Sequence, residues 1–129
     1  MTNPIRVTCA IIVHKNKTLV VQRSKTMKLP LKWEFPGGKI DFGETEEECI
    51  LREIKEELNI NIDIVSRLTP SPHKYPNISI ELIPFIAQFK NGSISLTEHK
   101  KYLWLKKGNL TDLDWAEADL PILKEYLTL

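Results

Sequence analysis

The stretch that decides the fold is GKIDFGETEEECILREIKEELNI, residues 38–60. Thr45 and Glu48 have the spacing of a capping box, in which the two residues satisfy each other's backbone N–H groups at the start of a helix. Three aliphatic side chains then recur at every fourth position: Ile50, Ile54 and Leu58. The stretch therefore predicts an amphipathic helix that starts at Thr45 and buries this face.

This helix carries more negative charge than a solvated face requires. Residues 44–57 hold seven glutamates against one arginine and one lysine. Glu53, Glu56 and Glu57 lie in the second half of the helix, where the dipole disfavours anions and the spacing brings like charges together. A hard divalent cation such as Mg²⁺ or Mn²⁺ would offset this repulsion, because it takes oxygen ligands. Spacing alone leaves two interpretations open, a metal site and an ordinary acidic surface.

The rest of the chain alternates between extended and turn signals. Extended segments are expected at 7–13, 18–22, 33–35, 60–65, 77–89 and 102–105. Turns are expected at 14–17 and at Asn91-Gly92, and Pro84 favours an edge position or a bulge. A second helix is expected over 120–127, with Asp119 as its N-cap. Strands before, between and after two helices predict an α/β fold, a mixed sheet with a helix on each face.

Composition bounds the class of protein. The chain has 129 residues, 42% of them hydrophobic and 27% charged, which predicts one globular domain over 1–129. A net charge of +1 favours neither a nucleic-acid polymer nor a membrane as partner. Cys9 and Cys49 lack metal or redox spacing, so free thiols in a reducing cytoplasm are expected. The histidines are expected at the surface or in loops rather than as ligands: His14, His73 and His99.

Residues 38–60 resemble the Nudix box, Gx5Ex7REUxEExGU, in which U is a bulky aliphatic residue. Eight positions fill the pattern: Gly38, Glu44, Arg52, Glu53, Ile54, Glu56, Glu57 and Ile60. The second glycine is replaced by Asn59, the next-best residue for a left-handed C-cap. WEFPGGKIDFGET, residues 33–45, is similar to the MutT-type branch of the Nudix hydrolases, which includes enzymes of the CTP pyrophosphohydrolase type.

The resemblance implies a Nudix α/β/α sandwich over the whole chain and divalent-metal-dependent chemistry. For the MutT-type branch the implied reaction converts a nucleoside triphosphate and water to the monophosphate and pyrophosphate. Modified or pyrimidine nucleotides such as 8-oxo-dGTP or (d)CTP are the implied substrates, and a monomer is expected. Two alternatives stay open: a non-catalytic nucleotide-binding module on this fold, and an ADP-ribose or dinucleotide pyrophosphatase.

Roles for single residues also follow from the resemblance. The implied metal ligands are Glu53, Glu56, Glu57, Glu98 and the backbone carbonyl of Gly37. Arg52 matches an arginine that orients a glutamate, with an ordinary ion pair to Glu48 or Glu56 as the alternative. Arg23 resembles a phosphate-contacting arginine. Phe35 and Tyr75 are candidates for stacking on the base, or are plain core or rim aromatics.

Asp119 has two competing interpretations. The segment around it, residues 116–121, resembles the base-contacting loop of the CTP pyrophosphohydrolase type. An ionised Asp only accepts hydrogen bonds, so it would favour a base that offers N–H donors, such as cytosine or 8-oxoguanine. The alternative role is that of N-cap for the last helix.

Overall fold

The structure is a computed structural model and describes residues 3–129. Its strands are β1 (Ile5–His14), β2 (Lys17–Gln22), β3 (Trp33–Glu34), β4 (Gly37–Lys39), β5 (Ile60–Arg67), β6 (Ser71–Tyr75), β7 (Ile78–Gly92) and β8 (Lys101–Lys106). Its helices are α1 (Glu46–Leu58) and α2 (Leu120–Leu127), with two 3₁₀ turns, η1 (Lys107–Asp112) and η2 (Glu117–Asp119). None of the helices in this part of the chain is both long and apolar enough to cross a membrane.

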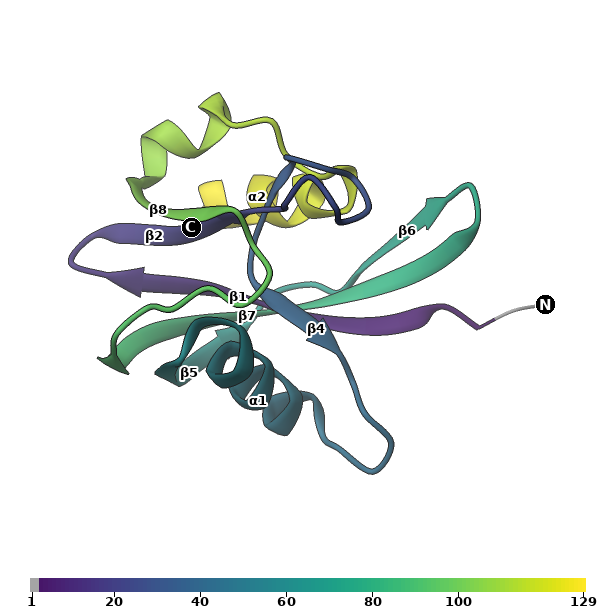
Figure 1. Ribbon diagram of the computed structural model, residues 1–129, viewed down its shortest axis with the longest axis horizontal. Helices are drawn as coiled ribbons and strands as arrows, with labels where there is room; N and C mark the ends of the chain where they lie inside the picture. Colours follow the sequence, from purple (N-terminus) through teal and green to yellow (C-terminus); the bar gives the residue numbers. More distant parts are fainter. Residues whose placement is uncertain (1–2) are drawn as a thin grey trace.

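The strands form one mixed sheet (Figure 1). Its central order is β3-β2-β1-β7-β5, and β4, β6 and β8 pair with β1, β7 and β2. The β1–β7 pair is parallel, from Ile5 opposite Ile80 to Val13 opposite Gln88, and the other pairs are antiparallel. The expected mixed sheet is thereby confirmed.

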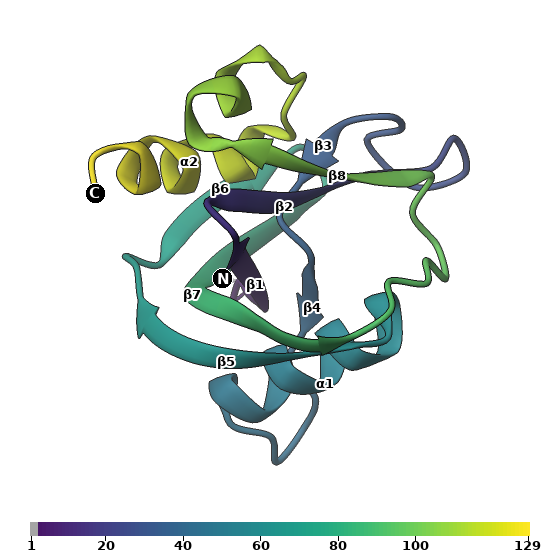
Figure 2. The same cartoon turned by 90° about the vertical axis from the view of Figure 1, so that its left-hand side faces the viewer.

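One helix covers each face of the sheet (Figure 2). The buried side chains of α1 are Cys49, Ile50, Ile54 and Leu58. Those of α2 are Ile122, Leu123 and Tyr126. Ile11 and Ile12 are neighbours on β1 and so point to opposite faces. Ile11 joins the core beneath α2 and Ile12 the core beneath α1, which confirms the expected layers.

The local signals around α1 and the first hairpin are confirmed. The Thr45 hydroxyl accepts the Glu48 N–H at 3.0 Å, and the Glu48 carboxylate accepts the Thr45 N–H at 2.9 Å. Asn59 ends α1 in the left-handed region, at φ 59°. Lys15 and Asn16, at φ 50° and 64°, make the two-residue turn between β1 and β2, where both central residues need positive φ.

Two expectations about β7 are wrong. Pro84 lies in the middle of the sheet, because β7 pairs with β1 on one side and with β5 and β6 on the other. The Pro84 carbonyl accepts the N–H of Leu68, in the gap between β5 and β6, so the missing proline N–H interrupts no ladder there. Asn91 and Gly92 make no hairpin turn, since both still pair with β5.

Candidate active site

Two glycines let three elements approach one another closely. Gly37 lies opposite Cys9 on β1, and a Cβ at Gly37 would collide with the carbonyl oxygen of Thr8. A Cβ at Gly38 would collide with the carboxylate of Glu53 on α1. The two glycines are therefore required for space, rather than for positive φ. Gly37 thus lets β4 pack against β1, and Gly38 lets β4 pack against the acidic helix.

Arg52 ties the loop before α1 to the helix itself. Its Nε donates to Glu44 Oε2 at 2.6 Å, and its Nη1 donates to Glu53 Oε1 at 2.9 Å. A further guanidinium hydrogen bond reaches the Lys39 carbonyl at 3.1 Å. The hydrogen bond from Arg52 lowers the pKa of Glu44 to about 2. Arg52 is therefore placed to hold Glu53, as the box implies.

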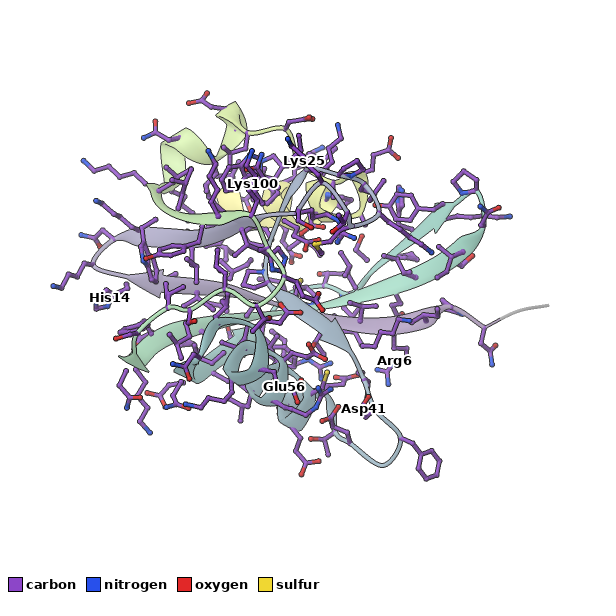
Figure 3. All side chains as sticks on the ribbon, viewed as in Figure 1. Arg6, His14, Lys25, Asp41, Glu56 and Lys100 are labelled. Atoms are coloured by element: carbon purple, nitrogen blue, oxygen red, sulfur yellow. The ribbon has the colours of Figure 1, made fainter. Side chains whose placement is uncertain are left out.

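The alternative expectation for Arg52 was an ion pair with Glu48 or Glu56. Arg52 pairs with Glu56 and not with Glu48. Arg52 Nη1 lies 3.1 Å from Glu56 Oε2 and Nη2 lies 3.4 Å from Asp41 Oδ2. The carboxylate of Glu48 serves the capping box with Thr45 instead. Figure 3 shows Glu56 on α1 and Asp41 in the loop that precedes the helix.

Glu57 is the most strongly perturbed acid of α1. Burial, followed by the charges of Glu53, Glu34 and Glu98, raises the pKa of Glu57 to about 9. Its Oε2 is buried and has no hydrogen-bond partner among residues 3–129. A divalent cation fits this oxygen, because it would supply the missing partner and offset the surrounding negative charge.

The acids do not form a ready-made cage. Within the described part of the chain, no three His, Cys, Asp or Glu side chains converge at metal-binding distance. Glu98 and Glu56 are exposed, and Glu56 is engaged by Arg52. The metal ligands therefore remain a prediction, and an ion would have to draw them together. They are Glu53, Glu56, Glu57, Glu98 and the backbone carbonyl of Gly37.

Glu34 and His99 belong to this region and were missed in the sequence. Glu34 Oε1 accepts from Arg23 Nη1 at 2.9 Å, and Glu34 Oε2 lies 2.8 Å from His99 Nε2. The His99 side chain is only 2% exposed, so the expectation of a surface or loop histidine holds for the loop and not for the surface. One signal was available: Glu34 is a charged residue between the aromatic residues Trp33 and Phe35 in an extended segment.

A cavity of about 430 Å³ opens on the α2 side of this cluster. Val7, Ile80 and Leu82 give it an apolar wall. Its charged and hydroxyl-bearing lining residues are Arg23, Lys28, Glu34, Tyr75 and Asp119. A largely apolar cavity with a few converging polar groups is typical of a small-molecule site.

Asp119 lies in this cavity and does not cap α2. Its Oδ2 accepts the backbone N–H of Phe35 at 2.9 Å, and its side chain makes no bond to the helix start. The N-cap interpretation is therefore wrong: Asp119 has helical φ and ψ, because η2 runs directly into α2. Burial and the charge of Glu34 raise the pKa of Asp119 well above its ordinary value.

The two candidate stacking aromatics lie in different places. Phe35 is 3% exposed and packs on Trp115, with ring centroids 4.8 Å apart. The Phe35 ring belongs to the hydrophobic core and does not line the cavity. Tyr75 does line the cavity, and its hydroxyl accepts the backbone N–H of Ala118 at 3.1 Å.

Comparisons with known proteins agree on one family. A family model described as NUDIX domain matches residues 2–126. The CTP pyrophosphohydrolase of Escherichia coli (strain K12) is 27% identical over 125 residues, 97% of this chain and 93% of the relative. The 8-oxo-dGTP diphosphatase of Proteus vulgaris is 32% identical over 106 residues, 81% of this chain and 87% of the relative.

Solved structures agree as well. The solution NMR structure of DNA mismatch repair protein MutT, a Nudix hydrolase from methicillin-resistant Staphylococcus aureus 252, is 38% identical with a TM-score of 0.80. That match covers 99% of this chain and 98% of the other. The solution structure of the E. coli ORF135 protein is 28% identical with a TM-score of 0.85, and the match covers 97% and 89% of the two chains.

Proposed function

Because this chain belongs to the Nudix family, we propose that it is a divalent-metal-dependent pyrophosphohydrolase of nucleoside triphosphates. The products are the nucleoside monophosphate and pyrophosphate. The observation that carries this proposal is the position of Glu34. Its side chain lines the cavity of about 430 Å³, and its charge also acts on Glu57 in the acidic cluster. A nucleotide base in the cavity would thereby have its phosphates beside the acids.

Mg²⁺ or Mn²⁺ is the proposed cofactor, held by Glu53, Glu56, Glu57, Glu98 and the carbonyl of Gly37. When bound, such an ion neutralises phosphate charge and lowers the pKa of a bound water. The partnerless Glu57 oxygen supports this assignment. Intact acidic positions also favour the enzyme over a non-catalytic binding module, which gains nothing from the repulsion between them.

The chain's own side chains supply binding and orientation. Arg52 holds Glu53 through a 2.9 Å hydrogen bond. Arg23 lines the cavity and is held by Glu34, and we assign it to a substrate phosphate. Asp119 offers the base its Oδ1, since Oδ2 is occupied by the Phe35 N–H. Tyr75 forms a wall of the cavity, and Phe35 contributes its backbone N–H, which holds Asp119.

The proposed substrate is a modified or pyrimidine nucleotide such as 8-oxo-dGTP or (d)CTP. Ionised Asp119 only accepts hydrogen bonds, and N–H donors from a bound base would favour this ionised form against the raised pKa of the buried side chain. Cytosine and 8-oxoguanine both provide such donors. Two of the relatives act, by their names, on CTP and 8-oxo-dGTP. Cys9 and Cys49 are both free, which supports a reducing, cytoplasmic location. The proposed oligomeric state is a monomer, and the proposed partner is the small nucleotide substrate.

A substrate panel tests this function. The protein is incubated with Mg²⁺ and, in turn, dCTP, CTP, dGTP, 8-oxo-dGTP and ADP-ribose, and the products are identified by phosphorus NMR. We expect pyrophosphate and a monophosphate from at least one triphosphate. Orthophosphate release, or turnover of ADP-ribose alone, would contradict the proposal. Tight nucleotide binding without turnover would favour the non-catalytic module.

A further inference from the structure

The loop between β7 and β8, residues 93–100, carries Glu98 and has few fixed points. The Ser95 N–H donates to the Leu58 carbonyl at 3.0 Å, and the Lys100 N–H donates to the Gln22 carbonyl at 2.9 Å. Glu98 itself is exposed and forms no ion pair within residues 3–129. No contact of its own therefore fixes the Glu98 carboxylate, and its position depends on the contacts that hold the neighbouring residues of the loop.

His99, the next residue, is held by a side-chain contact. Its imidazole is buried, and Nε2 lies 2.8 Å from Glu34 Oε2. An ionised carboxylate can only accept, so Nε2 donates. The other ring nitrogen, Nδ1, is buried and has no partner in the described part of the chain. The contact with Glu34 is therefore the polar link that holds this ring.

Glu34 is a firm anchor for the ring. It belongs to β3, paired with Val21 of β2, and its second oxygen accepts from Arg23 at 2.9 Å. Both of its oxygens are thus committed, and its side chain is 17% exposed. The Ser95 N–H bonds to the carbonyl of Leu58, the last residue of α1, so the loop passes the end of the helix that carries Glu57. The charge of Glu98 is accordingly one of those that raise the pKa of Glu57. Two side-chain hydrogen bonds, from Arg23 to Glu34 and from His99 to Glu34, therefore link the cavity to the loop.

We propose that His99 is a positioning residue for the metal site: its hydrogen bond to Glu34 holds the 93–100 loop so that Glu98 faces Glu57. The inference rests on the proposed function only in requiring that a divalent ion binds the acidic cluster. It gives a buried imidazole, which the reaction does not otherwise use, a part in metal affinity.

Two amide substitutions separate this role from plain packing. The side-chain nitrogen of His99→Gln sits near the place of Nε2 and can still donate to Glu34. The nitrogen of His99→Asn sits near the place of Nδ1, too short to reach Glu34. Both replace the ring by a polar amide, so they form a matched pair. His14→Asn is the control for the change from an imidazole to an amide, because the His14 ring packs against Phe89 and Trp104 and forms no hydrogen bond with Glu34 or Glu98 within residues 3–129.

The readout is Mn²⁺ binding without nucleotide, followed by electron paramagnetic resonance of the free ion, with a thermal melt in chelator to follow the fold. We expect His99→Asn to weaken Mn²⁺ binding about tenfold or more. His99→Gln and His14→Asn should bind within about threefold of the unaltered protein. In a Glu98→Gln background, His99→Asn should add little further loss, because the loop then has no carboxylate to position.

Equal Mn²⁺ affinities of the Asn and Gln variants would overturn the inference. So would losses from His99→Asn and Glu98→Gln that multiply in the double variant. If the melts show that His99→Asn fails to fold, His99→Leu replaces it, because leucine fills a buried site but cannot donate to Glu34. Unchanged Mn²⁺ affinity in that variant is then the overturning result. Mn²⁺ binding that follows the expected pattern without triphosphate hydrolysis would overturn the proposed function alone.

Discussion

Asp119 Oδ2 accepts the backbone N–H of Phe35 at 2.9 Å, and this contact joins η2 to the segment that carries Glu34. Two backbone bonds run beside it: the Trp33 N–H donates to the Asp114 carbonyl, and the Ala116 N–H donates to the Trp33 carbonyl, both at 2.9 Å. The chain before α2 thus lies against β3 for several residues. The Phe35 N–H holds Asp119 through Oδ2, which leaves Oδ1 to face the cavity.

Asp119→Asn tests whether this second oxygen reads the base. The amide carbonyl can keep the Phe35 hydrogen bond, while the amide nitrogen places a donor where the carboxylate offered an acceptor. We expect a loss of about 1–3 kcal/mol in transition-state binding of the preferred triphosphate and a smaller loss for others. The ranking of kcat/KM for dCTP, CTP, dGTP and 8-oxo-dGTP should therefore change. Parallel losses on all four, or none, would show that Asp119 does not set specificity.

Tyr75→Phe removes the hydroxyl that accepts the Ala118 N–H at 3.1 Å and keeps the ring that lines the cavity. Losing one hydrogen bond should lower the free energy of unfolding by about 1 kcal/mol. Because the bond holds the turn that carries Asp119, KM should rise several-fold while kcat stays level. Steady-state kinetics and denaturant unfolding measure the two effects. A fall in kcat at constant KM would assign Tyr75 to the reaction step instead.

Local signals made the first half of the fold predictable. Three of these signals depend only on residues close together in the sequence. They are the capping box of Thr45 and Glu48, the left-handed Asn59 and the turn at Lys15 and Asn16. The buried stripe of α1 follows from the 3.6-residue period alone. The pattern also placed the acids of α1 on neighbouring positions of one helix.

Long-range pairing accounts for what the sequence could not predict. Pro84 lies in a central strand because two separate partners, β5 and β6, leave a gap opposite it. The hydrogen bond of Asp119 spans 84 positions and that of His99 to Glu34 spans 65, so no spacing rule relates them. β6 was not expected, because its Ser-Pro-His-Lys-Tyr sequence lacks alternation and gains strand structure from pairing with β7.

Removal of divalent ions should abolish hydrolysis. The buried, partnerless oxygen of Glu57 and the charges around it give the site its need for a cation. We expect no turnover after treatment with chelator and full recovery with Mg²⁺ or Mn²⁺. The metal should also raise the melting temperature, since it binds the folded state alone. Full activity in metal-free buffer would refute the mechanism.

Gly37→Ala and Gly38→Ala should fail in different ways. At Gly37 the added Cβ meets the backbone of Thr8, which cannot rotate aside, so unfolding free energy should fall by about 1–3 kcal/mol or more. At Gly38 it meets the side chain of Glu53, which can move. Gly38→Ala should therefore keep most stability and lose metal affinity. Thermal melts in chelator and Mn²⁺ titrations separate the two, and identical effects of both substitutions would contradict this assignment.

Glu57→Gln should separate catalysis from folding. Burial and neighbouring carboxylates raise the pKa of Glu57 from 4.5 to about 9 in the metal-free fold, so the folded chain retains a proton that the unfolded chain releases above about pH 4.5. Its contribution to stability is fully present below pH 4.5 and is lost as the pH rises toward 9. Gln cannot ionise, so the variant should match the unaltered protein near pH 4.5 and melt higher than it near pH 9, both in chelator.

Activity with Mg²⁺ should meanwhile fall by orders of magnitude, because the amide removes one charge from the metal site. Glu47→Gln is the matched control: Glu47 lies exposed in the first turn of α1, and that variant should keep both its activity and its pH slope. Turnover of Glu57→Gln within a few-fold of the unaltered protein would mean that Glu57 holds no metal. Equal pH slopes for Glu57→Gln and the unaltered protein would mean that Glu57 ionises in the fold as freely as in the unfolded chain.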